Sequence, residues 1–286
     1  MEPIKNRYEF VVYFDVENGN PNGDPDAGNM PRTDPETSYG IVTDVCIKRK
    51  IRNYVDVVKG SEKGYKIIIN PDKSLNDKFT EAYDACGLEK NKEGKNTDDV
   101  EKAKAYICEN YFDVRTFGAV MSTGKDRCGT VRGPVQINFA RSIDKILPQE
   151  ITITRQARTT VDRAMEGNTE IGKKNIVPYA LYRTEGYVSA MLAEKTGFSE
   201  DDLELLWNAI INMFEYDRSA SRGKMCVRKL VVFKHATALG NCPAHILLDK
   251  VKAVKNEGVD FPRQYSDYTV TVDKDLPEGV ELIEKV

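Results

Sequence analysis

The chain has 286 residues, of which 40% are hydrophobic and 30% charged, and a net charge of −3. This composition is typical of a globular protein with a sizeable core, and the absence of an apolar run of eighteen residues or a secretory leader pattern predicts a cytoplasmic protein that neither spans a membrane nor is exported. Six scattered cysteines without a Cys-x-x-Cys pair and only two histidines leave little material for a zinc site or a histidine-centred active site, so we expect no metal or cofactor.

The first predicted strand covers residues 8–16, which are rich in aromatic and β-branched side chains. A loop follows over residues 17–35, where repeated proline and glycine exclude helix and sheet. So long a loop is typical of a functional or a disordered segment, and it carries Arg32. Its asparagines imitate a calcium loop, but Asn29 stands where the last glutamate ligand belongs, so we expect ordered turns there.

A helix is predicted from Thr43 or Asp44 to about residue 58, because either residue can cap its start. Lys48, Arg49 and Arg52 lie together on its flank, where a phosphate could bind. An ordinary solvated helix edge explains the same three cations, so both interpretations stay open. The apolar face of the helix consists of Ile47, Ile51, Tyr54, Val55 and Val58.

Residues 65–70 are predicted as a second strand, and residues 71–111 as a helical insertion with a loop tip at 90–97. A surface decoration is the simplest role for such an insertion. Its two short amphipathic faces consist of Leu75, Phe79, Ala82 and Tyr83, and of Val100, Ala103, Tyr106 and Ile107.

Residues 113–144 hold two apolar runs, 117–121 and 134–139, around a glycine-rich loop with Lys125, Arg127 and Arg132. Residues 113–186 carry 12 basic and 8 acidic side chains on an otherwise acidic chain. Glycine permits close backbone approach and arginine suits phosphate oxygens, so we predict a phosphate-binding loop on a nucleic-acid-binding sheet. A solvated loop beside a core strand is the alternative. The second run alternates like a strand, with its inward positions at Val135, Ile137 and Phe139.

Two known nucleotide-binding motifs are excluded in this stretch. Residues 118–125 have five residues instead of four between the glycines, and Asp126 stands in place of Ser or Thr, so they form no P-loop. Residues 115–120 lack the glycine and the later aromatic residues of the RNA-recognition strand motif. Bases stacked along the sheet are therefore not expected.

A protruding hairpin is predicted over residues 148–180, with arms at 151–154 and 177–182. Its basic tip could contact a polyanion, and the hairpin could equally be an oligomer arm. A core strand is expected at 187–192, followed by a helix that Ser199 caps. A basic loop at 217–224 with Arg222, and strands at 226–233 and 268–272, complete an order typical of a ferredoxin-like α+β core with two outgrowths. The apolar stripe of the helix consists of Leu203, Leu206, Trp207, Ile210, Ile211 and Phe214.

Five sequence motifs follow one another along nearly the whole chain. They are Asn18-Gly-Asn-Pro-Asn-Gly-Asp-Pro25, Pro31-Arg-Thr-Asp34, Thr43-Asp-Val-Cys-Ile-Lys-Arg-Lys-Ile-Arg52, Asp113-Val-Arg-Thr-Phe-Gly118 and Arg132-Gly-Pro-Val-Gln136. Together they resemble the backbone subunit of type I-C CRISPR Cascade complexes, in the Cas-seven family of the RAMP superfamily. The resemblance implies an α+β fold with a ferredoxin-like, RRM-like palm, a helical fingers insertion and a β-hairpin thumb. The palm would comprise residues 1–70, 112–147 and 181–286, the fingers residues 71–111 and the thumb residues 148–180.

The resemblance also implies a function without catalysis. Such a subunit polymerises along the backbone of CRISPR RNA in an antiviral complex and displays the bases for pairing with target DNA, so that base pairing reads sequence while the protein reads phosphate and shape. The implied partners are CRISPR RNA, target DNA through the guide, further copies in a helical filament, and the large, RNA-processing and small Cascade subunits.

The expected RNA-contacting residues follow from the matched motifs and segments. Arg163 and Met165 are assigned only by their place in the thumb. Arg115 and Phe117 lie in the matched motif at residues 113–118, and Arg222 lies in the basic loop at 217–224. The other residues in the matched motifs are Arg32, Lys48, Arg49, Arg52, Arg132, Gly133 and Gln136.

Two other functions remain as alternatives. Related backbone subunits of type III complexes resemble this fold and cut RNA with an acidic loop residue, so a metal-dependent ribonuclease is one alternative. A protein that binds single-stranded DNA and RNA equally is the other. The candidate carboxylates for the ribonuclease are Asp15, Asp24, Asp26, Asp34 and Asp44.

Overall fold

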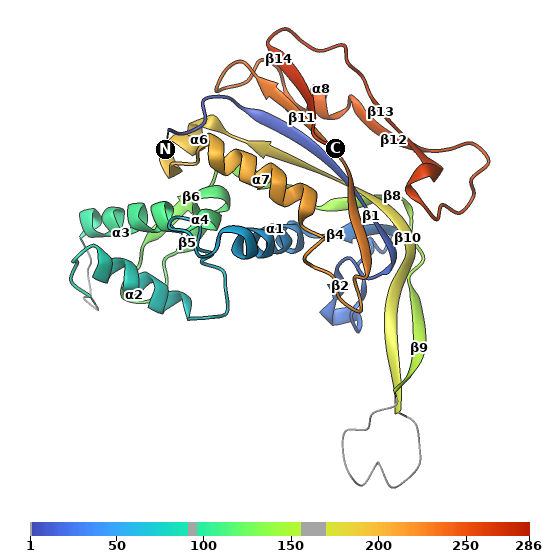
Figure 1. The fold of residues 1–286 in the computed structure, drawn as a ribbon, viewed down its shortest axis with the longest axis horizontal. Coiled ribbons are helices and arrows are strands. Elements are labelled where there is room, and N and C mark those ends of the chain that lie inside the picture. The colour runs from blue at the N-terminus through green and yellow to red at the C-terminus, as the bar shows by residue number, and fades with distance from the viewer. Residues whose placement is uncertain (1, 91–95, 156–169) are drawn as a thin grey trace.

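The structure is a computed structural model that describes residues 2–90, 96–155 and 170–286 (Figure 1). Its central strand is β1 (Tyr8–Gly19), whose first nine residues are all buried, which confirms the strand predicted at 8–16. β1 pairs antiparallel with β10 (Glu170–Val188) on one side and β11 (Lys224–His235) on the other. A strand with nine consecutive buried residues requires cover on both faces of the sheet.

The main sheet is antiparallel and has the strand order β14-β11-β1-β10-β8-β4. The outer strands are β14 (Val280–Glu284), β8 (Ala140–Lys145) and β4 (Tyr39–Val42), and β7 (Val135–Ile137) pairs with the end of β10. The fold is therefore mixed α and β around a large antiparallel sheet.

Helices cover one face of this sheet (Figure 1). They are α1 (Asp44–Lys59), α6 (Ala190–Thr196) and α7 (Glu200–Asn212). Thr43 caps α1, and Ser199 with Asp202 forms a capping box at α7, as the sequence predicts. Most of the predicted apolar positions of both helices are buried, but Val58 is 44% exposed because the last turn of α1 lies at the edge of the core.

The C-terminal segments cover the opposite face. α8 (Ala244–Leu248), β12 (Val251–Lys255) and β13 (Tyr268–Val272) pack on side chains of β1, β10 and β11, including Tyr13, Leu181 and Phe233. The strand predicted at 268–272 is confirmed, but it pairs with β12 in a separate two-stranded sheet. The tyrosine-rich far side of the main sheet is thus a second core.

A third buried cluster lies beside the main sheet. α2 (Leu75–Ala85), α3 (Thr97–Asn110) and α4 (Phe112–Phe117) pack with the hairpin of β5 (Gly118–Met121) and β6 (Gly129–Arg132). The two helices expected at 71–111 are confirmed. The cationic segment between the central apolar runs, expected as a loop, is partly strand, because residues 129–132 pair with 118–121.

Residues 65–70 are not the strand that the sequence predicts. Only the bridge between Lys66 and Tyr111 is formed. The reason is Asp113, whose carboxylate accepts the backbone N–H of Ile68 (2.8 Å) and of Ile69 (3.3 Å). These donors therefore bind a side chain instead of a neighbouring strand.

Other predicted boundaries are also wrong. Residues 177–182, expected in the hairpin, lie in the main sheet opposite β1, while residues 170–176 pair with β9 (Gln149–Arg155) to form the protruding arm (Figure 1). Residues 187–192 end β10 and begin α6, because Ser189 accepts the N–H of Leu192. Phe139 was expected to point inward, but it is 55% exposed because the strand is interrupted between the end of β7 and the start of β8.

The long N-terminal loop is more regular than expected. Within residues 17–35, β2 (Gly23–Asp24) and β3 (Met30–Pro31) pair around the short 3₁₀ helix η1 (Pro25–Ala27). Left-handed backbone at Gly28 and Asn29 (φ 60° and 62°) makes this turn possible. Across the described ranges of the chain, no helix is both long and apolar enough to cross a bilayer.

Candidate nucleic-acid interface

Phe117 lies where α1, α4 and the β5–β6 hairpin meet. Its ring has the Lys48 ammonium nitrogen at 5.7 Å and the Arg52 guanidinium carbon at 5.2 Å from its centroid, within the range of cation–π attraction. Phe117 is 8% exposed. The Phe117 ring therefore contacts two cations of α1 and is too buried to stack on a base.

Each of these cations also has an acidic partner. Lys48 Nζ lies 2.9 Å from Asp44 Oδ2, and Arg52 Nε lies 2.8 Å from Asp113 Oδ2. The Lys48 and Arg52 side chains are 13% and 11% exposed. They are fixed groups at the edge of the core, unlike the mobile cations of a solvated helix face.

The turn after β6 packs directly on Phe117. A Cβ built on Gly133 would lie 2.3 Å from the Phe117 carbonyl carbon and from the Gly118 nitrogen, so only glycine permits this approach. Arg132 precedes it, is exposed, and has no side-chain hydrogen bond or ion pair with any residue that the structure describes. Gln136 is exposed, and its Nε2 donates to the Gly133 carbonyl at 3.4 Å.

The structure thus brings six of the expected site residues into one continuous cluster, which we call the α1–α4 cluster. A fixed pair of cations, an exposed arginine, a glycine turn and an amide lie together on it. This combination can grip phosphate oxygens without selecting a base. Its members are Lys48, Arg52, Phe117, Arg132, Gly133 and Gln136.

Arg49 is not part of the α1–α4 cluster. Its Nη1 donates to the Ile69 carbonyl at 2.7 Å, and it borders an open cavity of about 580 Å³ with Pro71 and Leu75. No described contact joins it to Phe117. Arg49 therefore anchors the segment that leads into α2, and any RNA contact would use its remaining donors.

Arg32 and Arg222 lie in the loops near the N-terminus of α1. Arg32 pairs with Asp24 at 3.4 Å, and its buried Nε has no hydrogen-bond partner among the described residues. Arg222 Nε pairs with Asp217 at 2.7 Å, and Lys50 binds the same carboxylate. Asn22 fixes the N-terminal loop to α1, since its Oδ1 accepts from Thr43 N and Oγ1, both at 3.0 Å.

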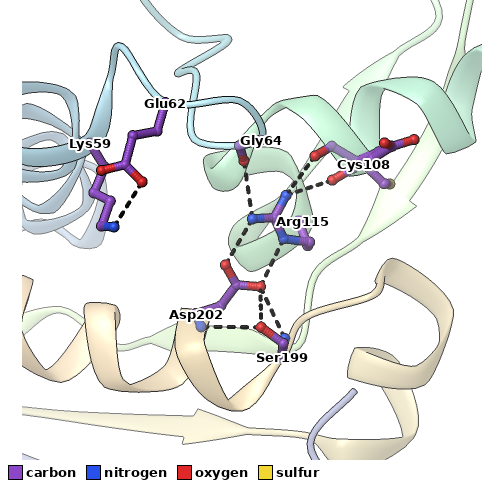
Figure 2. A network of polar contacts seen from close by, with 8 residues as sticks. Lys59, Glu62, Gly64, Cys108, Arg115, Ser199 and Asp202 are labelled. Carbon is purple, nitrogen blue, oxygen red and sulfur yellow. Dashed lines mark hydrogen bonds and ion pairs between the residues drawn. The ribbon is translucent and has the colours of Figure 1, made fainter. Parts of the chain in front are cut away.

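Arg115 was expected at the RNA site, but it lies in the interior of the protein. Figure 2 shows its polar contacts. Its five N–H donors are all used: Nε and Nη2 bind the Asp202 carboxylate at 2.9 and 2.8 Å, Nη2 also donates to Gly64 O at 3.1 Å, and Nη1 donates to the carbonyls of Cys108 and Glu109 at 2.8 and 3.2 Å. At 3% exposure it cannot reach RNA. Two other expected contacts, Arg163 and Met165, lie outside the described residues.

The carboxylates considered for metal-dependent cleavage are dispersed. Asp15 is buried on the far face of the sheet, where it accepts from Arg228 Nε (2.9 Å) and Tyr179 OH (3.0 Å), and burial raises its pKa. The Glu36 backbone N–H holds the pKa of Asp34 below its usual value. Asp24 caps η1 through the N–H of Asp26 at 3.2 Å, and Asp44 pairs with Lys48. In the part of the chain that the structure describes, no three His, Cys, Asp or Glu side chains are grouped to hold a metal ion.

One residue at this site is missing from the sequence-based set. Asp113 holds Arg52 and is 1% exposed. Its signal in the sequence is its place in the same motif as Arg115 and Phe117, but nothing in the spacing indicates that its partner is a helix sixty residues earlier.

Comparison with known proteins identifies the family. The model of the family described as CRISPR-associated protein Cas7 matches residues 6–273. A CRISPR-associated protein Cas7 from Haloferax volcanii is 28% identical over 312 aligned residues, which cover 98% of this chain and 84% of that protein. A chain of a solved CRISPR RNA-guided surveillance complex, pre-nicking, has a similar fold, with a TM-score of 0.50 at 13% identity over 79% of this chain and 75% of that chain. Because the family model spans almost the whole sequence, the chain belongs to the CRISPR-associated protein Cas7 family.

Proposed function

We propose that this chain is a non-catalytic, RNA-binding backbone subunit of a type I-C Cascade complex. Many copies would lie side by side along the backbone of the guide RNA and display its bases for pairing with target DNA. Its other partners would be the large, RNA-processing and small subunits of the complex. Membership of the Cas7 family supports this proposal.

A ferredoxin-like palm is part of the proposal. The strands and helices β1, α1, β8, β10, α7 and β11 follow one another in sequence and give the antiparallel order β11-β1-β10-β8. The order 4-1-3-2 is the one that two βαβ units produce when they share a sheet. In this division the α2–α3 helices are the fingers, the β9–β10 arm is the thumb, and the bounds expected from the sequence stay as predictions.

The observation that carries the proposal is the α1–α4 cluster. It offers several donors to phosphate oxygens, a buried glycine turn that packs the exposed Arg132 and Gln136 against Phe117, and no exposed aromatic ring, since Phe117 is covered. Such a surface binds a ribose-phosphate chain independently of sequence. Arg32, Arg49 and Arg222 would extend the RNA path along the loops near α1, and Arg163 and Met165 would belong to the thumb contact.

The absence of catalysis is proposed from the environment of the acidic residues. Asp15 is buried against Arg228, and Asp24, Asp34 and Asp44 each accept a local hydrogen bond or ion pair. Two-metal cleavage needs carboxylates that converge on an accessible point. Incubation of the assembled protein with complementary RNA and magnesium should leave the RNA intact, and cleavage that one Asp→Ala substitution abolishes would establish the ribonuclease instead.

Arg132→Ala is the direct test of the RNA site, because Arg132 is exposed and its loss removes no described contact. Fluorescence anisotropy with single-stranded RNA of several sequences should show weaker binding by a similar factor for each. The plot of log affinity against log salt should flatten by about 0.7, the value for one phosphate contact on a single strand.

The matched control is Arg263→Ala, an exposed arginine of the C-terminal layer. It should leave affinity and salt dependence unchanged. Equal effects of the two substitutions would mean that only net charge matters, and the α1–α4 cluster would not be the RNA site.

A further inference from the structure

Asp113 is a buried carboxylate in which both oxygens are engaged. Oδ1 accepts the N–H of Ile68 at 2.8 Å, and Oδ2 accepts the N–H of Ile69 at 3.3 Å and the Nε–H of Arg52 at 2.8 Å. The residue is 1% exposed. Because two backbone N–H groups and the start of α4 fix its position, Asp113 is a rigid acceptor for Arg52.

This contact uses only one side of the Arg52 guanidinium. Nη1 and Nη2 donate to none of the described residues, and neither is a buried atom without a partner, so both reach the surface. Phe117 lies under the group, with its centroid 5.2 Å from the guanidinium carbon. The group is thus held at Nε by Asp113 and lies over the Phe117 ring, while its two terminal nitrogens are accessible and have no partner among the described residues.

The terminal nitrogens of a guanidinium form the fork that matches two oxygens of a phosphate. An exposed arginine must give up rotamer freedom to present that fork, whereas Arg52 is already oriented before a ligand arrives. Lys48 adds a point charge over the same ring, at 5.7 Å from its centroid. Arg52 and Lys48 are therefore held in place over Phe117 without RNA, and we call this pair of cations the phosphate clamp.

We infer that Asp113 is a positioning residue for RNA binding, which aims the Arg52 fork at a backbone phosphate. The inference rests on the proposed function and goes beyond it, because an acidic residue near a phosphate site would by its charge alone weaken binding. Asp113 strengthens binding because it is buried and forms its ion pair with Nε of Arg52. The Nη1 and Nη2 donors of Arg52 stay available for a phosphate. The two backbone bonds also tie this clamp to the segment that leads into α2.

The test is a double-mutant cycle between Asp113→Asn and Arg52→Met in the full-length chain. An amide in place of the carboxylate keeps the shape but must turn an NH2 group toward either Arg52 Nε or the Ile68 N–H. Each single substitution should weaken binding of single-stranded RNA about tenfold, the size expected for one charge-assisted hydrogen bond. The double variant should bind no more weakly than Arg52→Met alone. The salt dependence should flatten by about 0.7 in all three.

Asp15→Asn is the matched control. Asp15 is also a buried aspartate that accepts an arginine Nε, from Arg228 at 2.9 Å, but it lies on the far face of the sheet. Its substitution should lower the melting temperature without changing RNA affinity or salt dependence. A loss of RNA affinity in this control would show that general destabilisation explains the effect of Asp113→Asn.

Arg52→Lys tests the same inference without altering Asp113. A lysine keeps the charge, but its single ammonium group would be held by the Asp113 carboxylate and could not also reach a phosphate. It should bind RNA nearly as weakly as Arg52→Met. Binding equal to the parent chain would overturn the positioning role.

The outcomes separate the two proposals. If Arg52→Met weakens RNA binding and Asp113→Asn does not, or if Asp113→Asn has its full effect in the Arg52→Met background, Asp113 serves only the fold and the inference fails. If Arg52→Met binds RNA as well as the parent chain, the proposed RNA site itself fails at α1.

Discussion

Replacing Arg115 with methionine should destabilise the protein by about 4 kcal/mol, because it removes one partner of a buried ion pair. Asp202 has no exposed surface, so in the variant its carboxyl group would lose its ion-pair partner without gaining contact with solvent. The Arg115 guanidinium also donates to the carbonyls of Gly64 and Cys108 (Figure 2) and to the carbonyl of Glu109. Methionine keeps the apolar stem and so limits any cavity.

The magnitude follows from what remains in the variant. Asp202 would still accept from Ser199 N at 3.0 Å and from Ser199 Oγ at 3.2 Å, which offsets part of the loss. The range for one broken buried pair is about 3–5 kcal/mol, and about 4 kcal/mol is a large share of a typical stability of about 5–15 kcal/mol. With an unfolding entropy of about 0.6 kcal/mol/K for a chain of this length, the melting temperature should fall by about 7 °C.

Thermal and urea unfolding, followed by circular dichroism, measure this loss. The double variant Arg115→Met with Asp202→Asn is the control, because asparagine keeps the cap on α7 without an uncompensated charge. It should be at least about 1 kcal/mol more stable than Arg115→Met alone. A loss below about 1 kcal/mol for Arg115→Met, or no recovery in the double variant, would refute the assignment of Arg115 to the fold.

Three further predictions concern packing and pH. Gly133→Ala should destabilise the protein by about 2 kcal/mol or more in urea unfolding, because the new Cβ would meet the Phe117 backbone at 2.3 Å; unchanged stability would mean that the turn can move. Burial raises the pKa of Tyr83 to about 12, so stability should fall as pH rises from about 10, where the unfolded tyrosine ionises, to that value, and Tyr83→Phe should lack this part of the slope. The hydrogen bond from Lys229 lowers the pKa of Glu284 in the folded chain. Ionised Glu284 should therefore contribute about 0.5 kcal/mol to stability above the ordinary carboxyl pKa, and this contribution should be lost as pH falls through the lower pKa of the folded state. A stability difference between the parent chain and Glu284→Gln that persists in acid would contradict this.

The sequence alone identifies the elements whose signals are local. The strand at 8–16, the helix that Thr43 caps and the helix that Ser199 caps are all confirmed. The strand is marked by its aromatic and β-branched side chains and each helix by its own period and cap, so no distant residue is needed to define them. The family motifs also lie in short contiguous stretches, and the family match over residues 6–273 confirms the Cas7 family that they indicate, while type I-C stays a proposal.

Two of the wrong predictions depend on partners far away in the chain. Residues 65–70 have strand-forming side chains, but Asp113 takes their backbone donors. Residues 177–182 continue one long strand into the main sheet, where β1 pairs with them. A β-prone segment does not specify which strand it will pair with, since pairing is decided by tertiary contacts.

For the candidate site, too, some features could be predicted from the sequence and others depended on the tertiary structure. The sequence alone determined that cations gather on one flank of α1 and around the glycine-rich stretch at 118–133. Only the tertiary structure decided that Lys48 and Arg52 meet over Phe117, that Arg49 faces Ile69, and that Arg115 is enclosed by Asp202. An arginine in a sequence carries the same charge whether it faces a phosphate or a buried carboxylate, and the choice depends on which residues the fold places within about 3 Å of it.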